Sequence, residues 1–556
     1  MNIRQHLRPG SPPSLRAPAG RSTAPPLWLT VAAIAAAFAP GAAAQTQTGY
    51  DMRAVVPEGS PFHGVHGLRF DAQGRLHAAS VIGQSIFTVD VDTGAVERLI
   101  GPPEGMADDI AFAADGTMVW SAIEDGVLYV KPPEGPIRRR LEDVKGVNAV
   151  AFDPAGERLF FTLVFYGDAL YELDVASDAP PRLIAENLGG LNAFGVADNG
   201  MIYGPLVFGG AVVEVDPGNG EVRVVSDRFE SPGALKLDGR GSAYVHDGDV
   251  IRQVELATGD TDVIAELPSE ADNLALDAEG RLFVSLAEEN AIVEVDVDTG
   301  EVEYVVGPSA LNSPAGLAAV PGAAGTTLYV GDTFGGIRIV ETPTGRVEHT
   351  PVDMFQPTHV AVRGQHLIAS NEVFGDVQRL DRDTFEVLEQ WSGFERPSDV
   401  LEAPDGSLIV AETGTGRLLH VTGTGSEDRR VIVADLASPR GLAWAEDGGS
   451  VYLTEADGGR LLKIAVASGD TEILATGLRR PEGVAADAEG RAVVVEVGAK
   501  RIRRFSSDGS STLIASDLPV GLSVGPSLYR GVAVGGSAIF FSSDIDNTIY
   551  ELTPSE

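Results

Sequence analysis

A pattern of about forty residues recurs along almost the whole chain and restricts the fold more than any other feature. Residues 64–100 and 270–306 show it in the same order: an apolar strand, a D-x-x-G turn, a second strand, a third strand ending in Asp, a TG turn and a fourth strand. This is the period of a four-stranded propeller blade. First strands can be anchored at Leu68, Ile110, Val150, Phe194, Leu235, Leu274, Leu317, Val360, Val400, Leu442, Val484 and Val532.

Twelve such repeats exceed the roughly four to eight blades of one ring. The pattern therefore predicts an all-β chain of two tandem six-bladed β-propellers, with four-stranded antiparallel blades. The last repeat lacks a fourth strand, and residues 51–59 read as an unmatched strand before the first repeat. We expect an offset closure, in which 51–59 completes blade six and 301–307 opens the second ring and completes blade twelve. The predicted domains are 45–300 and 301–556.

The first 44 residues have the features of a secretory signal. An apolar run at 27–39 is short for a membrane span, and small residues at 41–45 suit cleavage after Ala44. The basic residues before the run are Arg4, Arg8, Arg16 and Arg21. We expect a protein exported to the periplasm or the exterior, with an uncleaved anchor as the alternative. The chain has no Cys, which excludes disulfides and thiolate chemistry.

The chain is strongly acidic. Its formal net charge is −39, and loss of the four leader arginines would make it −43. A surface of this sign repels nucleic acid and anionic membranes, so we expect neither as a partner after signal cleavage. The charge also concentrates cations, although an ordinary solvated acidic surface explains it equally well.

Polar residues recur where the inner strands of the first ring begin. The position two residues before each anchor should lie at the mouth of the central channel, and it is occupied in turn by His66, Asp108, Asn148, Asn192, Gly233 and Asp272. Asp and Asn oxygens suit a hard divalent cation, most readily Ca²⁺. His66 fits Zn²⁺ or Mn²⁺ better, or serves as a base. Alternatively, these side chains only cap strand entrances by accepting bonds from backbone amides.

The same positions differ in the second ring. They are Ala315, Thr358, Ser398, Arg440, Glu482 and Arg530. Two guanidinium groups beside one carboxylate would repel a cation and could hold an anion or a carboxylate-bearing partner. The alternative is a salt-bridge cluster that seals the channel.

Three segments of the first ring resemble a known family. "NAVAFDPAGERLFF" (148–161), "NAFGVADNGMIYG" (192–204) and "DNLALDAEGRLFVS" (272–285) are similar to the two Asn segments and the Asp segment of the SMP-30/gluconolactonase superfamily of six-bladed propellers, which includes paraoxonase-like enzymes. The resemblance implies that Asn148, Asn192 and Asp272 hold a catalytic divalent cation. His66 stands where that family has Glu, and Asp108 could supply the missing charge. Segments of the second ring such as "RPSDVLEA" and "RPEGVAAD" resemble NHL repeats, which mostly bind partners.

Two functions follow as hypotheses. The resemblance implies a metal-dependent hydrolase of a lactone or ester, in which the cation polarises the carbonyl. Asp272, His66 and Asp109 are the candidates for activating water, whereas His63 fits a loop cap better than a base. The alternative is a non-catalytic double-propeller scaffold that binds a protein, a glycan or a small ligand, because propellers host both kinds of function.

Overall fold

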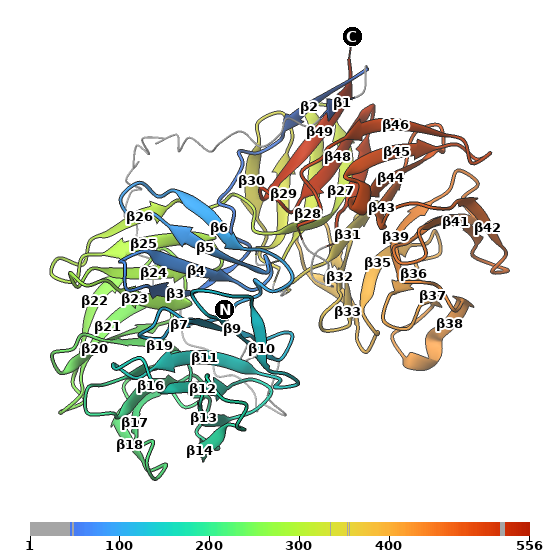
Figure 1. The fold of residues 1–556 in the computed structure, drawn as a ribbon. Coiled ribbons are helices and arrows are strands. Elements are labelled where there is room, and N and C mark those ends of the chain that lie inside the picture. Colours follow the sequence, from blue (N-terminus) through green and yellow to red (C-terminus); the bar gives the residue numbers. More distant parts are fainter. Residues whose placement is uncertain are drawn as a thin grey trace, which may run out of the picture.

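The computed structural model describes residues 45–46, 49–333, 335–352, 354, 356–522 and 529–555. The predicted signal, residues 1–44, lies outside this part of the chain. The described residues form twelve antiparallel sheets, with only two short 3₁₀ turns, η2 (Ser426–Asp428) and η3 (Val497–Ala499). No helix among them is long and apolar enough to cross a membrane. The predicted all-β fold of two six-bladed β-propellers is confirmed, and Figure 1 shows the two rings beside each other.

The first ring comprises the six blades from β3 to β26. Neighbouring inner strands pack on one another around the ring, and the inner strand of blade six packs beside that of blade one. Each blade is a meander in which sequence neighbours pair, as short Asp/Gly turns favour. The inner strands are β3 (Val65–Phe70), β7 (Ile110–Phe112), β11 (Val147–Phe152), β15 (Gly195–Val196), β19 (Pro232–Leu237) and β23 (Asn273–Leu276).

The second ring follows the same plan and closes between β47 and β27. Its inner strands are β27 (Pro314–Gly322), β31 (His359–Arg363), β35 (Pro397–Glu402), β39 (Pro439–Trp444), β43 (Pro481–Ala486) and β47 (Val532–Gly535). A fifth short strand, β1 (Gln45–Thr46), extends blade eleven beside β46 (Ser511–Ser516). The core of each ring lies between blades, where both faces of the sheets are buried.

The predicted offset closure is wrong. β26 (Val302–Val306) pairs with β25 (Ala291–Val295) and stays in blade six, so the first ring closes with its own strand and extends past the predicted boundary at 300. The N-terminal strand β2 (Tyr50–Ala54) instead pairs with β49 (Thr548–Pro554) and completes blade twelve of the second ring (Figure 1). The short turn at 296–300 favours the local hairpin over a distant partner. β2 then supplies the fourth strand that the last repeat lacks and covers the edge of β49.

The "DVDTG" segments are turns between third and fourth strands. Asp90 Oδ1 accepts a hydrogen bond from the backbone N–H of Thr93 at 2.9 Å, and Asp296 does the same for Thr299 at 2.9 Å. A short side chain that bonds the backbone two or three residues ahead fixes the turn without a metal ion. These contacts agree with the TG turn that the repeat pattern predicts between the third and fourth strands.

The segment between β2 and β3 is hydrogen-bonded to both rings. Gly64 donates its backbone N–H to Asn290 Oδ1 of the first ring at 2.7 Å. Asn547 of the second ring donates Nδ2 to the carbonyl of Ser60 at 2.9 Å and accepts from the N–H of Ser313 at 2.9 Å. Asn290 and Asn547 are both buried with positive φ, a conformation that Asn tolerates better than most residues. These bonds hold the two chain crossings between the rings together.

Candidate functional site: the mouth of the first propeller

Three predicted residues meet where blades six, one and two adjoin. His66 lies in β3, Asp272 directly precedes β23, and Asp108 lies two residues before β7. The Nδ1 atom of His66 is 3.2 Å from Oδ1 of Asp272 and 3.9 Å from Oδ1 of Asp108. Blades one and six are far apart in sequence, and closure of the ring brings their inner strands together. The structure thus forms a histidine–carboxylate cluster at the channel mouth.

The cluster holds His66 in its charged form. Burial by itself lowers the pKa of the imidazole, but the charge and hydrogen bond of Asp272, and the charges of Asp108 and Glu124, outweigh burial and raise it to about 9. In return, although burial opposes ionisation, His66 holds the pKa of Asp272 below its usual range. His66 is therefore a cation beside an ionised carboxylate at neutral pH.

The pKa of Asp108 is shifted in the opposite direction from that of Asp272. Burial raises its pKa to about 7; the cation at His66 opposes this rise, and the charges of Asp272, Asp109 and Glu124 add to it. Glu124 lies in the turn between β8 (Met118–Ala122) and β9 (Val127–Lys131), and its own pKa is raised by burial and by Asp125. A carboxyl group that titrates near neutral pH can both accept and return a proton.

A second histidine supports the cluster, and the sequence reasoning missed it. His246 lies in β20 (Ser242–Asp247), and its Nε2 is 3.0 Å from the backbone carbonyl of Asp272. Burial lowers the pKa of His246 to about 4, although Asp272 opposes this shift, so the ring is neutral and can donate this bond. A Cβ on Gly233 would lie 2.1 Å from the His246 ring. Gly233 was the one rim position without a side chain, and its place is filled by His246 from the next strand.

The remaining predicted residues occupy different surroundings. Asn148 and Asn192 belong to the same rim, at the starts of the inner strands of blades three and four, and Asn192 Oδ1 is a buried atom without a hydrogen bond among the described residues. Asp109 is hydrogen-bonded to the backbone of two inner strands. Its two side-chain oxygens accept the N–H groups of Ile110 at 2.9 Å and Val150 at 3.1 Å. We therefore leave Asp109 out of the catalytic proposal. His63 is fully buried and pairs with the carbonyl of Pro61 at 3.2 Å, as the loop-cap interpretation expected.

Asp272 and Asp108 of the predicted ligand set face His66 in the structure. Within the described ranges, no three His, Asp or Glu side chains are placed so that they could hold one. His66 Nδ1, a potential ligand atom, is instead bonded to Asp272. The cation, whether Ca²⁺, Zn²⁺ or Mn²⁺, stays a prediction.

The mouth of the second ring is filled with ion pairs. Arg440 donates Nη1 to both oxygens of Glu372, at 2.8 and 2.9 Å, and Arg396 donates Nη2 to Oε1 at 2.8 Å. Of the three residues predicted to form one cluster, Arg440 thus bonds to Glu372, Glu482 pairs with Arg480 at 2.9 Å, and Arg530 pairs with Asp544. The salt-bridge alternative describes this ring, although with other partners than those predicted.

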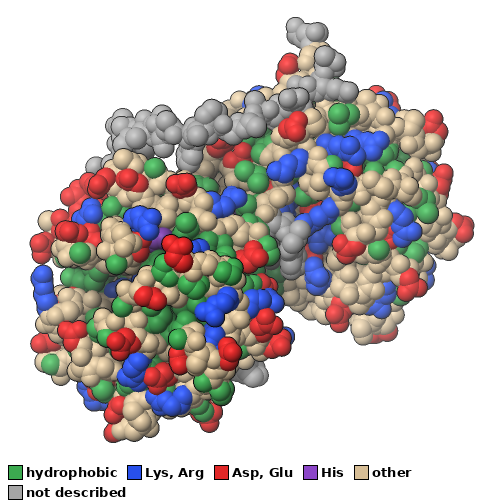
Figure 2. Space-filling model, viewed as in Figure 1, with side chains coloured by type: hydrophobic (Ala, Val, Ile, Leu, Met, Phe, Trp, Pro, Cys, Tyr) green, Lys and Arg blue, Asp and Glu red, His purple; other side chains and the backbone are tan. Residues whose placement is uncertain are grey.

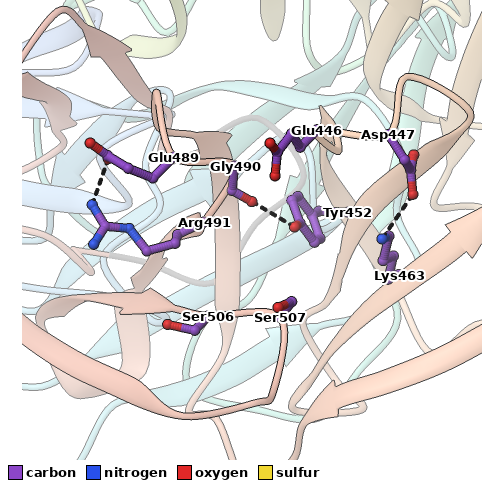
Figure 3. Close-up of a pocket in the computed structure, with 9 residues that line it drawn as sticks. All are labelled: Glu446, Asp447, Tyr452, Lys463, Glu489, Gly490, Arg491, Ser506 and Ser507. Atoms are coloured by element: carbon purple, nitrogen blue, oxygen red, sulfur yellow. Dashed lines mark hydrogen bonds and ion pairs between the residues drawn. The ribbon is translucent and has the colours of Figure 1, made fainter.

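A surface pocket of about 370 Å³ lies away from both mouths, between the outer parts of blades ten and eleven (Figure 3). Its charged side chains are already paired: Lys463 contacts Asp447 at 2.8 Å and Arg491 contacts Glu489 at 2.7 Å. The Tyr452 hydroxyl donates to the carbonyl of Gly490 at 2.7 Å. Most of the charge that lines the pocket is therefore already compensated.

The solved structures that resemble the chain do so at low identity. The extracellular domain of a hybrid two-component system from B. thetaiotaomicron is 13% identical, with a TM-score of 0.33, and the match covers 89% of this chain and 76% of that one. Luciferin-regenerating enzyme is 17% identical (TM-score 0.35; 44% and 92% covered), and virginiamycin B lyase from Staphylococcus aureus is 17% identical (TM-score 0.25; 58% and 94% covered). No curated protein matches the sequence. These values carry no functional argument.

A protein-family comparison is more specific. The family described as SMP-30/Gluconolactonase/LRE-like region matches residues 341–520, which lie in the second ring. The rim segments that suggested the same superfamily lie in the first ring, so the two observations come from different parts of the chain. Residues 341–520 therefore resemble this family, and the resemblance to the superfamily that was inferred from the sequence is confirmed at this level.

Proposed function

We propose that the protein is a hydrolase of small esters or lactones and that its active site is the mouth of the first propeller. The observation that carries the proposal is the cluster of His66, Asp272 and Asp108, in which a cationic imidazole lies 3.2 Å from one carboxylate and 3.9 Å from another. The match of residues 341–520 to a family named for gluconolactonase supports a hydrolase in general terms.

The groups have complementary roles in the proposed reaction. Asp108 accepts a proton from a water molecule as its oxygen attacks the substrate carbonyl. His66, held as a cation by Asp272, stabilises the negative charge that develops on the carbonyl oxygen. When the tetrahedral intermediate collapses, the carbon–oxygen bond to the alcohol breaks and Asp108 returns the proton to the leaving oxygen. Water is thereby added across the ester, and the site returns to its starting state.

The test is a panel of neutral esters and lactones, measured on the intact protein with and without a chelator. Asp108→Asn and His66→Gln should each lower kcat/KM by about a hundredfold or more, as removal of a general acid or base does. The second ring provides a matched control, because His359 Nε2 lies 2.9 Å from Oδ1 of the buried Asp399. His359→Gln removes a comparable pair away from the site and should leave kcat/KM unchanged.

The chelator distinguishes this proposal from the predicted metal mechanism. Hydrolysis that persists in EDTA supports the acid–base cluster, whereas loss of hydrolysis that Ca²⁺, Zn²⁺ or Mn²⁺ restores would support the predicted cation. Asp272→Ala should then weaken metal binding more than Asn148→Ala or Asn192→Ala, because it removes a charge as well as a ligand. Failure of the wild-type protein to hydrolyse any member of the panel would leave the scaffold hypothesis.

A further inference from the structure

Two neighbouring blades of the first ring carry the same aromatic turn. Residues 163–167 read LVFYG and residues 206–210 read LVFGG, each between the second and third strand of its blade. The first turn joins β12 (Leu159–Leu163) to β13 (Ala169–Leu173), and the second joins β16 (Ile202–Leu206) to β17 (Ala211–Val215). Phe165, Tyr166 and Phe208 are their aromatic residues, and we call these three the aromatic lip.

The aromatic lip borders the rim of the channel. The end of β12 pairs with the start of β11, since Leu163 lies opposite Val147, the neighbour of Asn148. In the next blade Leu206 forms a bridge with Leu191, the neighbour of Asn192. Both turns therefore emerge beside the two rim asparagines, and the first of them belongs to blade three, whose inner strand packs against that of blade two, the blade of Asp108.

Two aromatic side chains of the lip are exposed, and the backbone of its first turn is strained. Tyr166 is 67% exposed and Phe208 44%, and the rings of Phe165 and Phe208 meet edge to face at 5.8 Å across the two blades. Phe165 has a φ of 67°, and the N–H of Tyr166 bonds to the carbonyl of Val164 at 2.8 Å, a strained γ-turn. Exposing aromatic rings to water and straining the backbone both oppose folding, and such features concentrate at ligand sites.

The charge of Glu124 acts on both the lip and the cluster, and the acidic surroundings limit which ligands can bind. The negative charge of Glu124 adds to burial in raising the pKa of the Tyr166 hydroxyl, and the same Glu124 acts on His66. Asp108, Glu124 and Asp272 face a single imidazole in this region, on a chain of net charge −39. A ligand with its own carboxylate or phosphate would be repelled, whereas an uncharged or cationic one would not.

We infer that the aromatic lip selects the substrate, and that the substrate is an uncharged or cationic ester or lactone bearing an apolar, preferably aromatic, group. The apolar group packs on Phe165, Tyr166 and Phe208, and the carbonyl then faces the cluster of His66 and Asp108. This inference rests on the proposed function for the reaction, but the binding it describes can be measured without turnover.

The experiment uses four methyl esters and the intact protein. Methyl benzoate is neutral and aromatic, methyl 4-(trimethylammonio)benzoate is cationic, methyl 4-carboxybenzoate is anionic, and methyl acetate lacks the ring. Wild-type kcat/KM should be at least about tenfold higher for the first two than for the last two. Phe208→Ala should lower kcat/KM for methyl benzoate by about tenfold and change that for methyl acetate by less than about twofold.

The second ring supplies the matched control. Phe374 lies in the equivalent turn, between β32 (His366–Asn371) and β33 (Asp376–Asp381), and is 49% exposed. Phe374→Ala should leave all four values unchanged. Equal kcat/KM for the neutral and anionic benzoates, or equal effects of Phe208→Ala and Phe374→Ala, would overturn the inference while the proposed hydrolysis stood.

Calorimetry measures the binding of methyl benzoate to the Asp272→Asn variant, which should have lost most of its hydrolysis. It therefore tests the aromatic lip separately from the proposed hydrolysis. Binding that Phe208→Ala weakens by about tenfold supports the lip, even if no ester is turned over by the wild type. No binding of methyl benzoate, or binding unaffected by Phe208→Ala, would overturn it.

Discussion

The channel mouths of the two propellers occupy the same position in the fold but differ in how their charged side chains are compensated. At the mouth of the first ring three carboxylates face one imidazole, and the Asp272 side chain is 32% exposed. At the mouth of the second ring Glu372 is fully buried and bonded to Arg440 and Arg396. The acids and bases there are paired: Glu372 with Arg396 and Arg440, Glu482 with Arg480, Asp544 with Arg530 and Asp399 with His359. Charge is left uncompensated at the first mouth, whereas compensated charge fills the second.

The largest expected effect concerns closure. Deleting Tyr50–Ala54 should expose the edge of β49 and unfold the second ring at a much lower temperature, while the first ring, which contains all of its own strands, keeps its transition and its hydrolysis. Differential scanning calorimetry together with the ester assay measures both. Asp51→Asn, an exposed change on the same strand, is the control. A fall in unfolding temperature that is confined to the first ring would instead support the offset closure predicted from the sequence.

The next effect contrasts the two mouths directly. Glu372→Gln leaves Arg440 buried without its charged partner and should cost about 3–5 kcal/mol of unfolding free energy, with activity per folded molecule unchanged. Asp272→Asn should cost less than this, because its side chain is 32% exposed, yet should remove most of the hydrolysis. Chemical denaturation and ester assays on both variants check this. The reverse pattern would place the chemistry in the second ring.

A smaller effect is the pH dependence of the first mouth. Asp108 must lose its proton to act as a base, so kcat/KM should rise as the pH passes about 7, the pKa to which burial and neighbouring acids raise it. His66 must keep its proton, so kcat/KM should fall as the pH passes about 9, its raised pKa. A pH–rate profile of the wild-type protein shows whether activity lies between these limits. Activity that increased steadily above pH 9 would contradict the role of a cationic His66.

The smallest expected effect concerns Glu124. Its negative charge raises the pKa of both His66 and Asp108, so Glu124→Gln should move both limbs of the pH–rate profile to lower pH without abolishing activity. The control is Glu279→Gln, which changes an exposed acid on a turn of blade six. Identical profiles for the two variants would show that Glu124 does not act on the cluster.

The repeat predicted most of the fold because each repeat of the pattern forms one blade. The period did not reveal which strand fills the open edge of the last blade. That choice depends on the competition between a local hairpin at β26 and a partner far along the chain. The hairpin turn at 296–300 was visible in the sequence and could have decided it.

The site was predicted in part, for a related reason. His66, Asp108 and Asp272 share one position in the repeat, so aligning the inner strands found them. His246 and Glu124 come from a second strand and a turn, which that alignment did not include. The one available signal was Gly233, whose missing side chain leaves space for His246. Likewise the partners of Arg440 and Arg530 in the second ring come from ends of second strands and their turns.

The pairing of β2 with β49 also has a consequence for biosynthesis. These partners, for example Ala54 and Tyr550, are separated by almost the entire chain. At about 5–20 residues per second, β2 leaves the ribosome on the order of 25 to 100 s before its partner exists. The first ring can complete all six blades during that interval, because all of its strands lie between residues 65 and 306. Translation thus favours an order in which the propeller with the proposed active site folds first and the second propeller is closed last.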